Sequence, residues 1–211
     1  MTLSFITFEG VEGSGKSTQV GKLASKLREE GKSIEVVREP GGTRIGEMIR
    51  HITHDRENVE LTAVSEAYLM AGSRAQLVRD VIRPALDNGR IVISDRFIDS
   101  SLAYQGYGRG LGEEKIMKLN EMALDGVFPN LTFFLDITPD EGFKRRNGSQ
   151  KVDRLDLQQE EFYQRVYEGY KSLAEKYKER YRVVDGRDEI ETVAQKIWGE
   201  VKQKLQNPNL K

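Results

Sequence analysis

The sequence predicts an α/β fold in which a five-stranded parallel sheet is flanked by helices, so that the fold has three layers. Two observations lead to this prediction. Short apolar runs that favour strands alternate with longer amphipathic segments that favour helices along the 211 residues. The first such strand and helix are joined by Gly10-Val11-Glu12-Gly13-Ser14-Gly15-Lys16-Ser17, which fits the P-loop pattern G-x-x-x-x-G-K-[ST] at every fixed position.

Five runs are predicted to be strands because they are rich in β-branched and aromatic residues and are bounded by turn residues. They cover residues 3–8, 33–37, 90–94, 131–136 and 181–184. Because helical segments separate them, the strands are expected to run parallel and to be covered on both faces.

Helices are predicted where apolar residues recur at the helical spacing. They cover residues 18–30, about 44–52, 61–86, about 98–107, 113–124, 160–180 and 189–205. One further helix should begin at Thr138-Pro139-Asp140-Glu141, where Thr138 and Glu141 have the spacing of a capping box, and should break up at Asn147.

The domain organisation follows from chain length and from one polar stretch. The 211 residues suit a single domain, residues 1–211. The basic stretch at about 144–157 contains few apolar residues and interrupts the helical pattern, so it is predicted to be a small mobile lid.

Composition and charge restrict the class of function. The formal net charge is −1, which predicts no nucleic-acid partner and no anionic membrane surface. The chain has no cysteine, which excludes disulfides and thiol nucleophiles. The sequence runs directly into the first predicted strand and contains no apolar stretch of membrane-spanning length, so we expect a cytoplasmic protein.

The P-loop predicts binding of a nucleoside triphosphate. Its glycines allow backbone N–H groups to converge on phosphate oxygens, and the helix that opens at Ser17 and Thr18 adds positive potential. Lys16 is expected to reach the terminal phosphates, and the Ser17 hydroxyl is expected to bind Mg²⁺.

Parallel strands place the residues that follow them along one edge of the sheet, where ligands bind. This rule brings Asp95 and Arg96 next to the P-loop. Asp95 suits Mg²⁺, held directly or through water, although it could instead cap the next helix. Arg96 is placed to bind a phosphate through two parallel hydrogen bonds.

Two groups of arginines favour phosphoryl transfer to a second phosphate. Arg38, Arg50, Arg74 and Arg96 lie in segments that can face the same cleft, and Arg145, Arg146 and Arg154 lie in the predicted lid. A nucleotide kinase needs one cradle for ATP, a basic site for the acceptor phosphate and a lid that excludes water. The alternative for each lid arginine is a solvated surface charge.

Longer motifs resemble the thymidylate kinase family, and the resemblance covers nearly the whole chain. The segments that carry it are Phe8-Glu9-Gly10-Val11-Glu12-Gly13-Ser14-Gly15-Lys16-Ser17-Thr18, Arg38-Glu39-Pro40-Gly41-Gly42-Thr43, Asp95-Arg96-Phe97-Ile98-Asp99-Ser100-Ser101-Leu102-Ala103-Tyr104-Gln105-Gly106 and Leu119-Asn120-Glu121. The resemblance implies Mg²⁺-dependent transfer of phosphate from ATP to dTMP, and a homodimer with contacts in residues 61–86 and 119–124.

The resemblance also implies residue roles at the acceptor site. Glu12 resembles the acid that accepts a hydrogen bond from the sugar 3′-hydroxyl, and Arg38 and Arg96 resemble the arginines that hold the acceptor phosphate and the transferred group. The remaining acceptor residues are implied to be Arg74 on the thymine carbonyl, Ser101 and Gln105 on other base edges, Met70 against the base, Tyr104 against a ribose 2′-hydroxyl, and Pro40 and Arg50 in the site wall.

Within the family, the chain resembles the bacterial type, in which the lid supplies the extra arginine. The P-loop has Gly13 and Ser14 after Glu12, and the lid stretch is rich in basic residues: Arg145, Arg146, Lys151 and Arg154. We expect Arg154 to contact the transferring phosphate, and we place Arg145 and Arg187 near the ATP by position.

Two alternative functions remain open from the sequence. One is a related P-loop kinase with another acceptor, such as dUMP or a deoxynucleoside. The other is a nucleotide-binding module without catalysis, although no Asn/Thr-Lys-x-Asp guanine motif is present and the arginines of the lid would be unexplained. His51 and His54 are expected to be surface residues rather than metal ligands.

Overall fold

The computed structural model describes residues 3–146, 154–155 and 158–206. Its five strands form one parallel sheet in the order β2-β3-β1-β4-β5. They are β1 (Phe5–Glu9), β2 (Ile34–Arg38), β3 (Ile91–Asp95), β4 (Leu131–Asp136) and β5 (Tyr181–Asp185). The predicted fold class is confirmed, and each strand lies within two residues of its predicted bounds.

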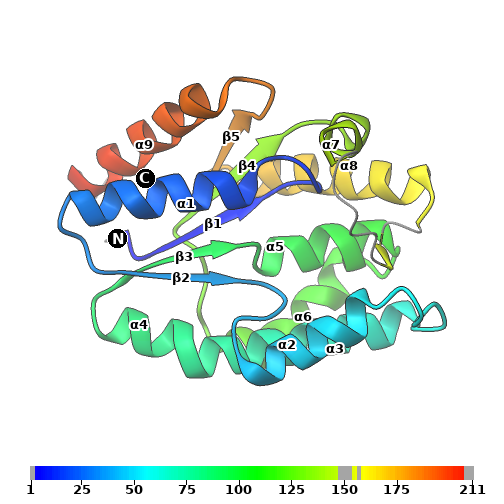
Figure 1. Cartoon of the computed structure of the whole chain (residues 1–211). Coiled ribbons are helices and arrows are strands. Elements are labelled where there is room, and N and C mark those ends of the chain that lie inside the picture. The colour runs from blue at the N-terminus through cyan, green and yellow to red at the C-terminus, as the bar shows by residue number, and fades with distance from the viewer. Residues whose placement is uncertain (1–2, 147–153, 156–157, 207–211) are drawn as a thin grey trace.

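Helices cover both faces of the sheet (Figure 1). One face is covered by α1 (Lys16–Glu29) and α9 (Ile190–Gln206). The other face carries α3 (Ala63–Leu77), α4 (Arg83–Asp87), α5 (Ile98–Ser101), α6 (Glu113–Leu124) and α8 (Glu160–Lys176). Two helices lie near the edge where the strands end: α2 (Arg44–His54), packed on α3, and α7 (Pro139–Arg146), packed on α8. No helix among the described residues is long and apolar enough to cross a membrane.

Side chains of each central strand alternate between two hydrophobic clusters. Ile6 and Phe8 of β1 belong to the cluster under α1 and α9, whereas Phe5 belongs to the opposite cluster and packs edge-on against Phe97, with ring centroids 4.8 Å apart. The opposite face also holds polar groups, including a 2.9 Å hydrogen bond between the hydroxyls of Thr7 and Thr132. Buried polar side chains of this kind need partners, and several of those partners belong to the site described below.

Two predicted helices are interrupted by π-helical turns, which corrects the prediction. The range 61–86 contains α3, the π-helical segment η1 (Val78–Ile82) and α4, and the range 98–107 contains α5 followed by η2 (Leu102–Gly108). A π-helical turn forms i→i+5 hydrogen bonds and holds an extra residue, but the two segments are shorter than the roughly 11–18 residues over which periodicity is read, so the pattern does not reveal them. Tyr104 and Gln105, both predicted to contact the substrate, lie in η2.

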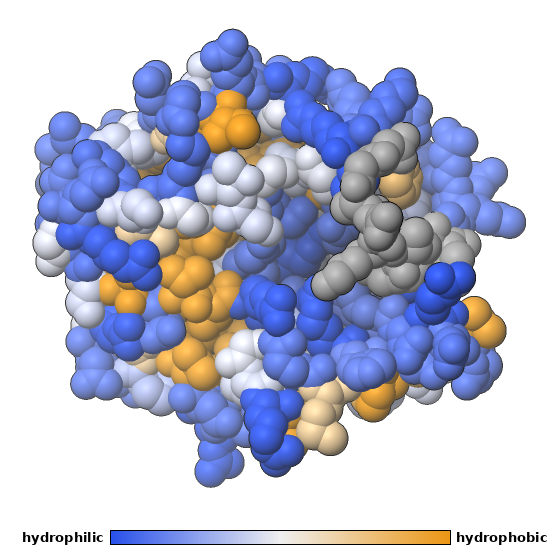
Figure 2. Space-filling model, viewed as in Figure 1, coloured by the Kyte–Doolittle hydropathy of each residue, from blue (hydrophilic) through white to orange (hydrophobic). Residues whose placement is uncertain are grey.

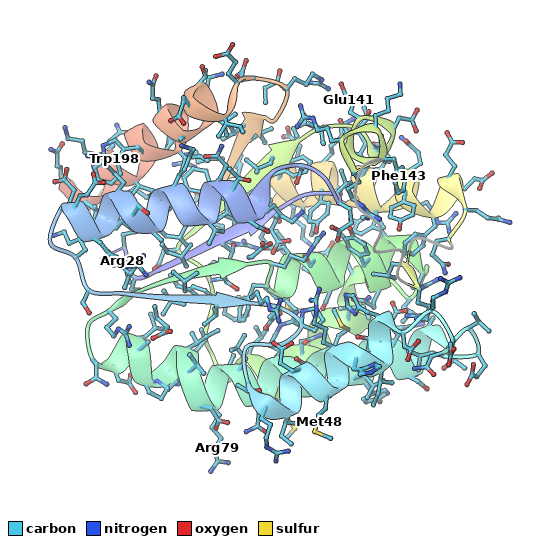
Figure 3. All side chains as sticks on the ribbon, in the orientation of Figure 1. Arg28, Met48, Arg79, Glu141, Phe143 and Trp198 are labelled. Carbon is cyan, nitrogen blue, oxygen red and sulfur yellow. The ribbon has the colours of Figure 1, made fainter. Side chains whose placement is uncertain are left out.

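The start of α7 confirms the predicted capping box. The backbone N–H of Thr138 donates to the Glu141 carboxylate at 2.7 Å, and the Glu141 N–H donates to the Thr138 hydroxyl at 3.3 Å. Phe143 then packs edge-on against Tyr163 of α8, with centroids 4.8 Å apart (Figure 3). The helix predicted over 160–180 ends earlier, at Lys176, because the N–H groups of Arg180 and Tyr181 turn back to the Tyr177 carbonyl before β5.

A buried ion pair holds α5 against the start of β5. Arg180 donates to both carboxylate oxygens of Asp99 at 2.7 Å, and it also donates to the Thr132 hydroxyl at 2.7 Å. The Asp99 side chain is fully buried, whereas that of Arg180 is partly exposed. Because the charges are desolvated, removal of one partner leaves the other without compensation.

We therefore expect Asp99→Ala to lower the free energy of unfolding by about 3–5 kcal/mol, as measured by urea denaturation. Asp80→Ala is the matched control, since Asp80 is exposed and hydrogen-bonds Gln76 within one helical region. The control should change stability by less than about 0.5 kcal/mol. Equal losses in the two variants would contradict the importance assigned to the buried pair.

Candidate active site

A cleft of about 430 Å³ opens at the carboxyl edge of the sheet. Figure 2 shows hydrophilic residues around a depression beside the atoms drawn in grey. Most of the predicted site residues line this cleft: Glu12, Gly13, Gly15, Lys16, Ser17, Thr18, Arg38, Pro40, Arg50, Met70, Asp95, Arg96, Tyr104, Gln105 and Arg145. The sheet thus brings together side chains from segments that are far apart in the sequence, as the edge rule predicts.

The P-loop adopts the conformation expected of an anion cradle. Gly10, Gly13 and Gly15 have φ values of 139°, 77° and 94°, a region that other residues rarely adopt. Helix α1 begins at Lys16, so its unpaired N–H groups face the loop. Val11 and Ser14 do not line the cleft, but the Val11 carbonyl and the Ser14 hydroxyl both accept hydrogen bonds from the Lys16 ammonium group.

The Lys16 ammonium group is buried and donates to the carbonyls of Gly10 at 3.1 Å and Val11 at 2.8 Å. Burial, together with the nearby charge of Arg96, lowers the pKa of Lys16 to about 8. The side chain is therefore still mostly cationic at neutral pH and points along the loop that would surround phosphate oxygens.

Ser17 and Asp95 lie together, as a magnesium site requires. The Ser17 hydroxyl donates to the Asp95 carboxylate at 2.5 Å, which joins the start of α1 to the end of β3. Hydroxyl and carboxylate oxygens are the ligands that Mg²⁺ prefers, so the two residues fit the ion. The alternative role of Asp95 as a helix cap finds no support, because α5 begins after Phe97 and has no side-chain cap.

Arg96 connects the P-loop to the acceptor side of the cleft. It adopts a left-handed backbone conformation with φ of 71°, which turns the chain sharply after β3. Its guanidinium donates to the Glu12 carboxylate at 2.6 Å and to the Gly10 carbonyl at 3.0 Å, and also to the hydroxyls of Tyr170 at 3.0 Å and Tyr104 at 3.3 Å. The guanidinium is thus held in a fixed position.

The Glu12 carboxylate is ionised in this setting. Burial alone would raise its pKa, but the charges of Arg96 and Lys16 outweigh burial and lower the pKa of Glu12 to about 2. An ionised group inside an anion cradle repels phosphate, which is consistent with a hydroxyl as its ligand.

Glu9, at the end of β1, is a buried carboxyl group that holds residues next to Arg96 by hydrogen bonds. It accepts hydrogen bonds from the Phe97 N–H at 2.8 Å, from the Ser100 hydroxyl at 2.6 Å and from the Tyr170 hydroxyl at 3.1 Å. Burial, and then the charge of Asp99, raises the pKa of Glu9 to about 7.

The acceptor side of the cleft carries Arg38 and Arg50. Arg38 donates to both oxygens of Glu47 at 2.9 and 2.8 Å, and Arg50 donates to the Pro40 carbonyl at 3.1 Å. Both arginines line the cleft while held by α2 and by the turn after β2. They can therefore face a second anion without further rearrangement of their backbone.

Arg74 and Ser101 do not line the cleft. The Arg74 guanidinium is 1% exposed and donates to Glu39 at 2.9 Å, to Asn120 at 2.5 Å and to the Ser101 hydroxyl at 3.0 Å. It thus cross-links α3, α6 and the turn after β2. The predicted contacts of Arg74 and Ser101 with the base stay predictions.

The structure also places Arg154 outside the cleft lining. Its backbone N–H donates to the His54 carbonyl at 3.0 Å, and its side chain donates to the Thr53 carbonyl at 3.0 Å and to the buried Glu66 carboxylate. Its predicted contact with the transferring phosphate stays a prediction. Of the predicted lid, residues 147–153 and 156–157, including Lys151, lie outside the described residues.

The two arginines placed near ATP differ in position. Arg145 lines the cleft and donates to the Gly186 carbonyl at 2.8 Å. Arg187 lies beside it on the loop after β5 but pairs with Glu141 at 2.9 Å and Asp185 at 3.0 Å, outside the cleft lining.

Four residues of the cleft were not predicted from the sequence: Glu39, His54, Ser100 and Leu155. His54, which was expected to be a surface residue near a helix end, is the last residue of α2, is half-buried and lines the cleft. Burial, and then the charge of Arg50, lowers the pKa of His54 to about 4. Its position four residues after Arg50 on α2 is a signal that could have placed it on the same helix face.

The backbones of the P-loop and α7 are in direct contact. A Cβ atom added to Gly142 would lie 2.1 Å from the Glu12 carbonyl oxygen, and one added to Gly13 would lie 2.2 Å from the Gly142 carbonyl oxygen. Only glycine at both positions permits this approach. The contact fixes α7, which carries Arg145, against the phosphate cradle.

The fold and the cleft define a class of protein. A P-loop on a parallel sheet, arginines on the opposite side of the same cleft and the basic end of α7 against the loop are the parts of a P-loop nucleotide kinase. The family model described as thymidylate kinase matches residues 8–197. The chain belongs to the thymidylate kinase family, and the resemblance inferred from the sequence is confirmed.

Individual relatives agree with this assignment. The chain is 50% identical over 201 residues to a thymidylate kinase of Caldanaerobacter subterraneus, covering 95% of this chain and 96% of the relative. It is 48% identical to a thymidylate kinase of Geobacillus thermodenitrificans, covering 90% of this chain and 85% of the relative. The crystal structure of thymidylate kinase from Ehrlichia chaffeensis superposes with a TM-score of 0.78 at 33% identity, covering 96% of this chain and all of that one.

The contact between Gly142 and the P-loop leads to a prediction. We expect Gly142→Ala to push α7 away from the cradle, because the nearest atom is a backbone oxygen that cannot turn aside. ATP affinity, measured by calorimetry, should fall at least about tenfold. Gly21→Ala on α1 is the control, since an added Cβ there meets nothing within 4 Å. The control should keep its ATP affinity and gain about 0.5–1 kcal/mol of stability.

The raised pKa of Glu9 leads to a second prediction. Between about pH 4.5 and about pH 7 the Glu9 carboxyl group is mostly protonated in the native state and mostly ionised in the unfolded state. The native state therefore loses stability relative to the unfolded state as the pH rises through that window. The lowered pKa of His54 has the opposite effect below about pH 6.5. The measurement is the free energy of unfolding in urea, determined at each pH for the wild type and for Glu9→Gln. The wild type should lose stability relative to the variant as pH rises, and a constant difference would contradict the raised pKa.

Proposed function

We propose that this chain transfers the terminal phosphoryl group of ATP to dTMP, giving dTDP and ADP. The observation that carries the proposal is the position of Arg96, whose guanidinium contacts the P-loop through Glu12 and Gly10 and the acceptor side through Tyr104. A cation at that boundary lies where the donor and acceptor phosphates meet. Membership of the thymidylate kinase family supports the identity of the acceptor.

Phosphoryl transfer requires alignment and neutralisation of charge more than covalent catalysis. An oxygen of the acceptor phosphate attacks the γ-phosphorus of ATP, so that a new P–O bond forms while the bond to the β-phosphate oxygen breaks and ADP leaves. Lys16 and Arg96 neutralise the charge that develops on the transferring oxygens, and Arg145 adds a third cation from α7. Arg38 and Arg50 hold the acceptor phosphate on the other side of the cleft.

Ser17 and Asp95 would hold Mg²⁺, directly or through water. When bound, the ion draws charge from the phosphate oxygens and orients the donor. Transfer of phosphate to an acceptor also requires that water be kept out, and the basic residues over the cleft, Arg145 among them, serve that purpose when substrates fill the site.

The acceptor pocket favours a deoxynucleotide. Burial raises the pKa of Tyr104 to about 12, so its phenol stays neutral, and it is fixed by the contact with Arg96. A ring held in that way excludes an added 2′-hydroxyl by shape. Met70 supplies an apolar surface for the base, and Gln105 supplies an amide for its polar edge.

Two further expectations stay predictions. A homodimer through α3 and α6 is supported by exposed apolar side chains on those helices: Val64, Tyr68 and Met122, the last 94% exposed. Met48, on the neighbouring helix α2, also points away from the body of the molecule (Figure 3). A cytoplasmic location is the second expectation, and membership of the thymidylate kinase family supports it.

The test is ADP formation from Mg-ATP with dTMP, dUMP, the ribonucleotide TMP, AMP, GMP and thymidine offered separately. We expect strong turnover with dTMP, weaker turnover with dUMP and negligible turnover with the others. Arg96→Met is the control and should reduce turnover by at least about a hundredfold. Turnover with a different monophosphate would overturn the acceptor assignment, and ATP binding without any turnover would favour the binding-module alternative.

A further inference from the structure

Glu66 is a buried carboxylate that the proposed reaction does not use. It lies on α3 behind the acceptor pocket, and 1% of the residue is exposed. It accepts N–H groups from three side chains: Gln105 at 2.7 Å, Arg109 at 2.9 and 3.3 Å, and Arg154. Both of its oxygens are therefore engaged, and one of them by Gln105, which lines the cleft.

The carboxyl group of Glu66 is ionised. Burial alone would raise its pKa, but the hydrogen bonds and charge of Arg109, with contributions from Gln105 and Arg154, outweigh burial and lower the pKa. An ionised carboxylate accepts hydrogen bonds and donates none. Any amide that faces Glu66 must therefore present its NH₂ group.

This restriction fixes the orientation of the Gln105 side chain. An amide can rotate by half a turn to exchange its oxygen and nitrogen, and only its partners decide between the two orientations. The Nε2 atom donates to Glu66, so the Oε1 atom points elsewhere, and it is buried without a hydrogen-bond partner among the described residues. A buried acceptor without a partner costs free energy until a ligand supplies a donor.

Gln105 lines the cleft and Glu66 does not, so the side of the amide that is not held by Glu66 is the side available to a base. An acceptor on that side would discriminate between bases. Thymine and uracil carry an N–H donor at N3 between two carbonyls, whereas cytosine has an unprotonated N3 that is itself an acceptor. An acceptor fixed in the pocket pairs with the first kind of base and repels the second. If the amide were reversed, its NH₂ group would face the pocket and would favour cytosine.

We propose that Glu66 is a positioning residue that sets base specificity, because it holds the Gln105 amide with its oxygen available to an imide N–H. This inference rests on the proposed function, since it assumes a pyrimidine monophosphate as acceptor. Glu66 does not line the cleft, and it acts on the base through Gln105. The same carboxylate holds Arg154, so the acceptor pocket and residue 154 share one anchor.

The test compares kcat/KM for dTMP and dCMP in the wild type and in Glu66→Gln. A glutamine at position 66 can donate as well as accept, so it permits both orientations of Gln105 while keeping the shape of the side chain. We expect the ratio of kcat/KM for dTMP to that for dCMP to fall at least about tenfold, the size of one hydrogen bond to a buried group. A role limited to stability would lower both values together and leave the ratio unchanged.

Arg109→Lys is the matched control. The lysine keeps a positive charge beside the Glu66 carboxylate, so Glu66 stays ionised and still requires the NH₂ group of Gln105. The ratio should therefore stay at the wild-type value. The double variant Glu66→Gln/Arg109→Gln restores the net charge of the cluster, and it measures specificity even if the single Glu66 variant folds poorly. The ratio in the double variant should fall as in Glu66→Gln.

The outcomes separate this inference from the proposed function. A wild type that phosphorylates dTMP, with a ratio that is unchanged in both Glu66 variants, overturns the inference and keeps the function. A ratio that falls equally in Arg109→Lys also overturns it, because the effect would then come from the cluster as a whole. A wild type without turnover on dTMP overturns both.

Discussion

The active-site cleft depends on one constraint: charges that are withheld from water must be paired. Desolvation of an isolated ion costs several kcal/mol, so each buried charge here has a partner that fixes its position. Arg96 shows this best, because its pairing with Glu12 and its hydrogen bonds to two tyrosines hold the guanidinium at the boundary of two phosphate sites. Because burial requires these partners, the same partners hold the guanidinium in the position that the reaction needs.

A second set of buried charges joins elements that lie at and behind the cleft lining. Arg74 connects Glu39 to Asn120, and Arg180 connects Asp99 to Thr132. Each pair links elements that are distant in the sequence. The apolar clusters on both faces of the sheet stabilise the fold, whereas these polar pairs specify which side chains meet at its edge.

The comparison of sequence and structure follows the same division. The P-loop, the strands and the capping box of α7 could be predicted because each depends on residues that are close in the sequence. The edge rule then located Ser17, Asp95 and Arg96 together, because parallel strands leave little choice. The burial of Arg74 and the contact of Arg154 with Glu66 could not be predicted, since each depends on partners from helices whose packing the local pattern does not encode. The π-helical segment that carries Tyr104 and Gln105 was missed because it is too short for sequence periodicity to distinguish it from an α-helix.

The backbone at Arg96 has a consequence for protein engineering. Its φ of 71° is unfavourable for a residue with a side chain, at a cost on the order of 1 kcal/mol. Glycine adopts that conformation freely, so it would relieve the cost in the backbone. The same change would delete the guanidinium that joins the two phosphate sites and leave the Glu12 carboxylate without its ion pair, a loss larger than the backbone gain. A redesign that scored backbone conformation alone would therefore select an inactive and less stable protein at position 96.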